Sequence, residues 1–415
     1  MPELRWRAPA PATPRAHLTS PATSARGADP ASAYLLLGLR LGRHVDGLVD
    51  FYYGPPELRD QVDSEPLTDP RQLGGQAAEL ADQLAPGSEW LREQLKGIAV
   101  YAGVLAGDAT TFADETEGCY GVRSRRVSED VFAAAHEQLD ALLPGDGPLG
   151  PRFQGWREQR AVPREQIGPA LEALVAALRE WTRSVVHLPD GESVAIDLVR
   201  GEPWLAFNYY LGELRSRVAV NDELPLTSDE LVSLVAHEAY PGHHTEHALK
   251  EAELVCGRGL LEESIALVPT PQPLVSEGIA KLGEDLVLDG AAATAAAEAL
   301  AGCGIDYDRD HVRAVLTACE PLAWVGENAA LMLHVDGVDR ETVSEYIERW
   351  RLLPRERAQR AVVFLTDPTW RAYSCTYVWG KRLCAAWLGD DVTRFVRLLT
   401  EQITVRELLA ADGAR

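Results

Sequence analysis

Hydrophobic residues recur at three- and four-residue steps along most of the chain, a spacing that places them on one face of an α-helix. From Pro169 to His187, leucine, valine and tryptophan follow this spacing and predict one buried helical face. The same pattern predicts helices over 31–54, 73–85, 89–107 and 128–145, where Ser128 is the expected N-cap. Helices are predicted again from Thr227 to the end of the chain, including the segments 290–302 and 390–410.

The pattern changes between the two helical regions. The segments 193–201, 203–212 and 214–222 are short, rich in β-branched and aromatic residues, and separated by glycine. These features predict a small antiparallel β-sheet. The expected fold is therefore mainly α, with one small antiparallel sheet before the segment that carries the candidate chemistry.

The predicted domain organisation is simple. Residues 1–30 are rich in proline, alanine and arginine, which predicts a disordered tail, with an organelle transit peptide as the alternative. Residues 31–415 are predicted to form a single mostly helical domain. Its N-terminal helical part is 31–190, and 191–415 holds the sheet and the metal-binding helices.

Charge and cysteine usage narrow the expected partners and location. The formal net charge of -23 argues against nucleic acid and against anionic membranes as partners. No apolar run approaches the ~20 residues that span a bilayer. The six cysteines are scattered without a CxxC pair, which indicates reduced thiols in a cytoplasmic protein. The oligomeric state is not specified by these features.

The segment "LVAHEAYPGHHTEHALKE", residues 234–251, contains four of the ten histidines. Thr227 and Glu230 predict a capping box at the start of the preceding helix. Pro241 follows His237 by four residues, so it cannot donate the helical hydrogen bond to the His237 carbonyl. We therefore expect the helix to bulge or break between Tyr240 and His243.

Two zinc-binding motifs match this segment of the sequence. In the first, His237 and a delayed His243 bind the ion while Glu238 polarises water, as in H-E-x-x-H, and the break restores the phase of His243. His244 is an alternative ligand. In an unbroken helix it would lie on the same face as His237, but about two turns further along the helix. In the second, His243, Glu246 and His247 form the inverted motif H-x-x-E-H, which needs no bulge. The spacing of these residues does not decide between the two motifs. A third interpretation is that the histidines bind no metal and are solvated at a helix break.

A later helix carries candidate carboxylate ligands. Glu277 lies in its first turn, Gly278 allows a close approach, and Glu284 follows two turns later on the same side. Two histidines and one glutamate would make a three-ligand catalytic zinc site with an open position for water. A lone glutamate in a helix is otherwise an ordinary surface charge.

Three motifs resemble a known family. "HEAYPGHH" (237–244), "SEGIAKLGE" (276–284) and "CTYVWGK" (375–381) are similar to the signature elements of the bacterial family called domain of unknown function 885. That resemblance implies a glutamate-zincin-like helical fold with His237, His243 and Glu277 as Zn²⁺ ligands and Glu238 as general base. The chain departs from the family at "HHTEH", which keeps Glu246 and His247 as residues that support the metal ligands or as members of the rival site.

The predicted function is a zinc metallopeptidase acting on a peptide or a small amide-containing substrate. Glu238 accepts a proton from the attacking water, and Tyr377 is the expected donor to the oxyanion. A substrate carboxylate is expected to bind Arg215 or Arg217 at the sheet. The alternatives are a metal-dependent hydrolase acting on a non-peptide metabolite and a non-catalytic metal-binding protein. An iron centre is less favoured, because a glutamate directly after the first histidine suits hydrolysis.

Overall fold

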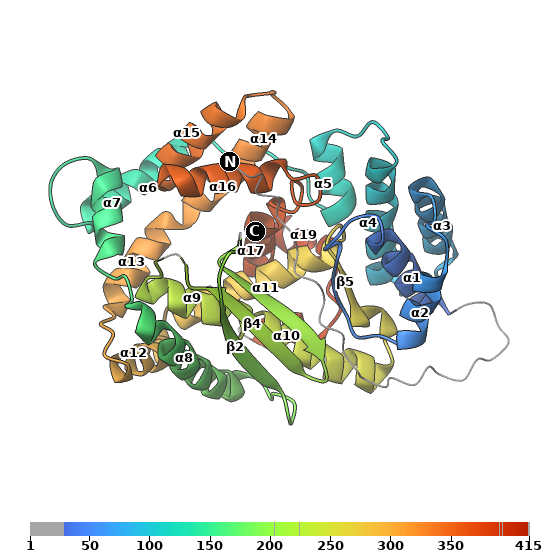
Figure 1. Ribbon diagram of the computed structural model, residues 1–415, viewed down its shortest axis with the longest axis horizontal. Helices are drawn as coiled ribbons and strands as arrows, with labels where there is room; N and C mark the ends of the chain where they lie inside the picture. Colours follow the sequence, from blue (N-terminus) through green and yellow to red (C-terminus); the bar gives the residue numbers. More distant parts are fainter. Residues whose placement is uncertain (1–28, 203, 224, 390, 392, 414–415) are drawn as a thin grey trace.

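The computed structural model describes residues 29–413, apart from residues 203, 224, 390 and 392 (Figure 1). Most of the predicted N-terminal tail therefore lies outside the described residues. The described chain is mainly helical, as the hydrophobic spacing predicts. None of its helices combines the length and apolar composition needed to cross a membrane.

The N-terminal part consists of helices joined by short turns. Ser128 caps its helix as predicted, by accepting a hydrogen bond from the Asp130 backbone. The predicted helix over 31–54 is wrong in its second half, where the strand β1 (Val49–Tyr52) follows α1. The helices of this part are α1 (Pro30–Gly42), α2 (Pro56–Ser64), α3 (Pro70–Gln83), α4 (Glu89–Leu105), α5 (Phe112–Tyr120), α6 (Glu129–Leu142), α7 (Leu149–Glu158) and α8 (Arg164–Val185).

The three predicted strands form one sheet, but its topology differs from the prediction. β4 (Arg215–Asn221) is central, and β3 (Ala206–Gly212) pairs with it antiparallel. β2 (Ser193–Val199) pairs with the other edge of β4 in parallel, so the sheet is mixed. The antiparallel prediction is therefore wrong for β2, because the chain crosses over through β3 before returning as β4. A separate antiparallel pair joins β1 to β5 (Ile265–Leu267).

The centre of the molecule follows the sheet. α9 (Ser228–Glu238) begins with the predicted capping box, in which Thr227 and Glu230 bond each other's backbone. α10 (His243–Lys250) continues into a π-helical turn, Glu251–Cys256, and a 3₁₀ turn, Leu261–Ser264. α11 (Pro271–Val287) then packs against α17, α9 and α10, and it is the helix around which the others are arranged.

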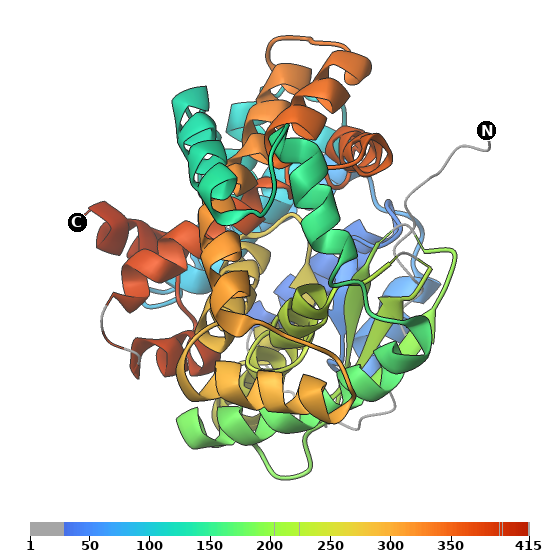
Figure 2. The ribbon, with the colours of Figure 1, turned by 90° about the vertical axis from the view of Figure 1, so that its left-hand side faces the viewer.

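The C-terminal part is again helical. Its final segment is predicted as one helix but forms two, α18 and α19. Figure 2 shows these last helices on the side of the molecule opposite the mixed sheet. The helices are α12 (Gly290–Gly302), α13 (Arg309–Cys319), α14 (Val325–His334), α15 (Arg340–Arg351), α16 (Arg355–Thr366), α17 (Cys375–Leu388), α18 (Thr393–Thr400) and α19 (Val405–Gly413), with a 3₁₀ turn at Glu320–Trp324.

One hydrophobic core joins the N-terminal and C-terminal halves of the described chain. Tyr34 and Leu95 from the first half and Leu274 and Leu383 from the second belong to the same buried cluster. Burial of this apolar surface is the main favourable term in folding. It packs α11 against α17, α9 and α10, and this placement positions the site described next.

Candidate metal centre

The two candidate histidine ligands meet at a break between α9 and α10. α9 ends at Glu238, and α10 begins at His243. Gly242 passes so close to the end of α9 that a Cβ there would overlap the carbonyl oxygen of His237. The break therefore requires glycine at this position, and it brings the rings of His237 and His243 to a centroid distance of 4.7 Å. The structure has the break that Pro241 predicts.

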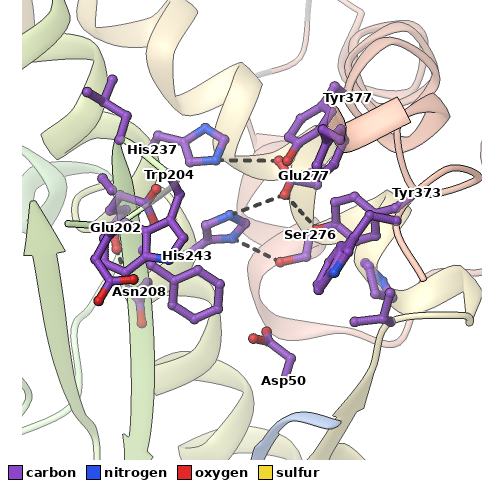
Figure 3. A pocket seen from close by; sticks show the side chains of 18 of the residues that line it. Asp50, Glu202, Trp204, Asn208, His237, His243, Ser276, Glu277, Tyr373 and Tyr377 are labelled. Carbon is purple, nitrogen blue, oxygen red and sulfur yellow. Dashed lines mark hydrogen bonds and ion pairs between the residues drawn. The ribbon is translucent and has the colours of Figure 1, made fainter. Parts of the chain in front are cut away.

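The third member of the group comes from α11. Oε2 of Glu277 lies 3.4 Å from Nε2 of His237, and Oε1 lies 3.9 Å from Nε2 of His243 (Figure 3). One ligand atom from each residue lies within 4.8 Å of the others. Within the described part of the chain, these three residues form the group of histidine, cysteine and acidic side chains that could hold one ion.

The Nδ1 atoms of His237 and His243 already take part in hydrogen bonds. Nδ1 of His237 lies 2.8 Å from Oε1 of Glu284 on α11. Nδ1 of His243 lies 3.0 Å from Oγ of Ser276, whose own proton is donated to Glu246. A carboxylate and a hydroxyl oxygen so engaged can only accept, so each histidine donates through Nδ1. Each Nε2 then faces Glu277, which is the orientation that metal-binding histidines usually have.

The charge balance of the group fits a bound cation. Burial alone would lower the pKa of His237, but the carboxylates of Glu277 and Glu284 outweigh it and raise this pKa to about 10. Burial would raise the pKa of Glu277, yet His237 holds it at about 2. Oε2 of Glu277 is buried and makes no hydrogen bond of normal geometry with a described residue, and it lies 3.4 Å from Nε2 of His237. A metal ion between these atoms would satisfy this buried oxygen.

Glu238 and Tyr377 line the same cavity, whose volume is about 800 Å³. The Glu238 carboxylate makes no hydrogen bond with a described residue, and burial raises its pKa, against the opposing effect of His237 and His243. Tyr377 comes from α17, and burial holds its hydroxyl pKa well above the usual range. Tyr373, which the sequence does not single out, donates a 2.7 Å hydrogen bond to Oε1 of Glu277.

His244 lies outside the group, contrary to its prediction as an alternative ligand. It is fully buried, with Nδ1 2.9 Å from Oγ of Ser216 and Nε2 3.0 Å from Oε2 of Glu192. Both ring nitrogens are therefore engaged on the far side of α10. His244 belongs to a buried network that ties α10 to the sheet.

The inverted motif is also not assembled. Glu246 accepts hydrogen bonds from Lys250 and from Ser276, and Oγ of Ser276 lies 3.0 Å from Nδ1 of His243, so this carboxylate is linked to His243 through one hydroxyl. His247 stacks on His243 with a centroid distance of 5.8 Å, packs against Phe51 in a T-shaped arrangement and lies tilted against Tyr210. Burial lowers the pKa of His247 to about 3, so this ring is neutral.

The predicted substrate-binding arginines do not reach the cavity, and this expectation is corrected. Arg215 is exposed at the start of β4 and pairs with Glu213, while Arg217 pairs with Asp197 on β2. Their strand lies in the middle of the sheet, and β3 separates it from the cavity. The arginines in the cavity wall are Arg351 and Arg360, at the end of α15 and in α16.

Comparisons with known proteins address the fold. No protein-family model matches the chain, and no curated protein matches it. A solved structure of a "putative lipoprotein" from Colwellia psychrerythraea is similar in fold, with a TM-score of 0.53 and 15% sequence identity over 84% of this chain and 67% of that one. Another, of a "putative lipoprotein of unknown function" from Shewanella oneidensis, has a TM-score of 0.49 and 14% identity over 91% and 72% of the two chains. The first likeness concerns the fold alone.

Proposed function

We propose that the protein is a zinc-dependent metallopeptidase that hydrolyses an amide bond in the cavity between β3, α9, α11 and α17. The observation that carries the proposal is the convergence of His237, His243 and Glu277, which each place one ligand atom within 4.8 Å of the others. Two imidazoles and one carboxylate are a common ligand set for catalytic zinc, which keeps a further position open. A zinc ion held there would supply Lewis acidity that lowers the pKa of a water molecule.

The protein's own groups around these ligands suit hydrolysis. Glu238 follows His237 directly, faces the cavity and has no hydrogen-bond partner among the described residues, so its carboxylate is free to take a proton from water. Burial raises its pKa toward the range in which it can also return that proton to the leaving amine. The Tyr377 hydroxyl, which makes no hydrogen bond with a described residue, would donate to the developing oxyanion.

The sheet offers a place for an extended substrate. β3 is an edge strand, and Ala206, Phe207 and Asn208 line the cavity. An edge strand presents unpaired backbone groups to which a peptide can add as a further strand. Aromatic side chains from α16 and the turn before α17, including Phe364 and Trp370, form another part of the wall. The resemblance to the domain of unknown function 885 family agrees with this proposal and stays a prediction.

The test is cleavage of a mixed peptide library by zinc-loaded protein, read by mass spectrometry. We expect cleavage by the wild type and a loss of about 10²-fold or more in Glu238→Gln, with fold and zinc content retained. A folded, zinc-loaded wild type that cleaves no peptide would refute the peptidase proposal and favour a non-peptide substrate. Full activity in Glu238→Gln would instead remove Glu238 from its role as base.

A further inference from the structure

One acidic side chain in the cavity belongs neither to the metal group nor to the proposed base. Asp50 in β1 lines the cavity, and Figure 3 shows its carboxylate directed into it, on the side away from His237. The sequence predicts a helix over this segment, and no sequence motif connects Asp50 to the site. The question is what such a carboxylate binds.

The local strand geometry aims this side chain at the cavity. Consecutive residues of a regular strand point to opposite faces of the sheet. In β1 the register against β5 shifts between Val49 and Phe51, which is a β-bulge at Asp50. As a result both Asp50 and Phe51 line the cavity. Bulges beside functional sites commonly redirect one side chain in this way.

The Asp50 carboxylate has no partner among the described residues. No described residue donates a hydrogen bond to it or forms an ion pair with it. It is open to the cavity, but the surrounding protein restricts its hydration, and burial, with further contributions from Glu277 and Glu238, raises its pKa to about 7. A carboxylate in such surroundings is stabilised by a cation that arrives with a ligand.

A second acceptor lies in the wall formed by β1, β5 and the start of α11. Gln272 is buried, and its Nε2 is used in a 3.2 Å hydrogen bond to Glu263. Its Oε1 accepts no hydrogen bond from a described residue, and the residue lines the cavity. This wall therefore offers a carboxylate acceptor and a neutral amide acceptor. That chemistry suits a group with several N–H donors and a positive charge.

The charges of the whole cavity point the same way. Besides Asp50, the lining includes Glu202, Glu223, Glu238 and Glu277, against two arginines from α15 and α16 and no lysine. The metal and the proposed chemistry account for Glu277 and Glu238. Asp50 is the acidic side chain that β1 adds to this wall.

We propose that Asp50 and Gln272 form a subsite for a protonated amine of the substrate. The inference rests on the proposed function and narrows it, because the scissile amide would then lie close to an ammonium group. A free amino terminus and a basic side chain both supply this chemistry. The experiment below separates them.

Binding can be measured without turnover in zinc-loaded Glu238→Gln, by calorimetric titration with three probes. Leucinamide carries a free α-amine, N-acetyl-leucinamide carries none, and N-acetyl-lysinamide carries its amine on the side chain. We expect leucinamide to bind about ten-fold or more tightly than its acetylated form, the size of one charge-assisted hydrogen bond. Preferential binding of N-acetyl-lysinamide would assign the subsite to a basic side chain.

The effect is assigned to Asp50 by substitution in the same background. Adding Asp50→Asn should bring the affinity ratio between the amine and its acetylated form to about one. Adding Asp46→Asn should leave the ratio unchanged, because Asp46 is exposed in the preceding turn and outside the cavity. Circular dichroism melting checks that each variant is folded.

Two outcomes overturn the proposal: equal binding of all three probes, or an amine preference that survives Asp50→Asn. Neither depends on peptide hydrolysis. Absence of peptide cleavage by the wild type, together with an Asp50-dependent preference for the amine, would refute the peptidase function alone. Peptide cleavage without that preference would refute the subsite alone.

Discussion

Nδ1 of His237 lies 2.8 Å from Oε1 of Glu284, which stands two turns beyond Glu277 on the same helix, α11. One rigid element thus supplies both a candidate ligand and the carboxylate that orients another. Glu284 is itself held by Ser233 and Lys281, at 2.6 and 2.7 Å. The position of α11 against α9 therefore sets the geometry of the whole centre.

The first prediction concerns this orienting carboxylate. Glu284→Gln keeps an acceptor oxygen but removes the charge that holds the His237 ring, so zinc affinity should fall about 10- to 100-fold. Competition with a chromophoric chelator measures the change. Glu298→Gln on the exposed face of α12 is the control and should bind zinc like the wild type. An unchanged affinity in Glu284→Gln would show that the contact does not support the metal.

The second prediction separates neighbouring histidines. His243→Ala should lose bound zinc, because it removes one of three converging ligand atoms. His244→Ala should keep stoichiometric zinc but lose about 1–3 kcal/mol of unfolding free energy, since Ser216 and Glu192 lose a buried partner. Metal analysis and urea denaturation of both variants check this. Zinc loss in His244→Ala with His243→Ala fully loaded would reverse the assignment.

The third prediction separates two tyrosines of the cavity. Tyr373→Phe removes the donor to Glu277, so it should weaken zinc binding. Tyr377→Phe should leave zinc affinity intact and lower kcat by about 10- to 10³-fold, because its hydroxyl would act on the oxyanion alone. Zinc titration and steady-state kinetics on one cleaved peptide give the comparison. Equal effects of the two substitutions on zinc affinity and on kcat would count against separate roles for the two tyrosines.

The fourth prediction tests the close packing of α11 on α17. A Cβ on Gly278 would lie 2.5 Å from both Sγ of Cys384 and the carbonyl oxygen of Gly380. Gly278→Ala should therefore destabilise the protein by about 1–3 kcal/mol through overpacking. Gly326→Ala in α14 is the matched control, because nothing lies within 4 Å of its Cβ, and it should be neutral or slightly stabilising. Urea denaturation measures both, and equal stability of the two variants would contradict the packing argument.

The fifth prediction concerns acid stability. Burial would raise the pKa of Glu192, but hydrogen bonds from His244, Tyr240 and Arg179 lower it to about 2. Since the folded pKa is below the unfolded value, Glu192 stabilises the fold above about pH 4.5, by about 3 kcal/mol, and this contribution is lost as the pH falls toward 2.

Glu192→Gln should accordingly be less stable than the wild type at neutral pH, and the difference should shrink below about pH 4.5. Urea denaturation at a series of pH values measures it. Glu180→Gln is the control, because the side chain of Glu180 is 80% exposed. A stability difference that does not change with pH would show that Glu192 is not ionised by this network.

The sequence by itself determined the features that depend on neighbouring residues. Thr227 and Glu230 specify the start of α9, and Pro241 and Gly242 specify its break, because capping and helix interruption act within one or two turns. Hydrophobic spacing likewise indicated most helices, and β-branched and aromatic residues between glycines indicated the three strands of the sheet. The residue types needed for a metal site were visible for the same reason.

Only the tertiary structure decided which of these side chains meet. His243 and His244 are adjacent in sequence, and Ser216 and Glu192 on the sheet side engage the second, leaving the first to face Glu277. The parallel pairing of β2, the distance of Arg215 from the cavity and the bulge that directs Asp50 all arise from contacts between segments far apart in the chain. Local sequence patterns do not specify such contacts, because the free energy that selects these contacts comes from burial in the assembled core.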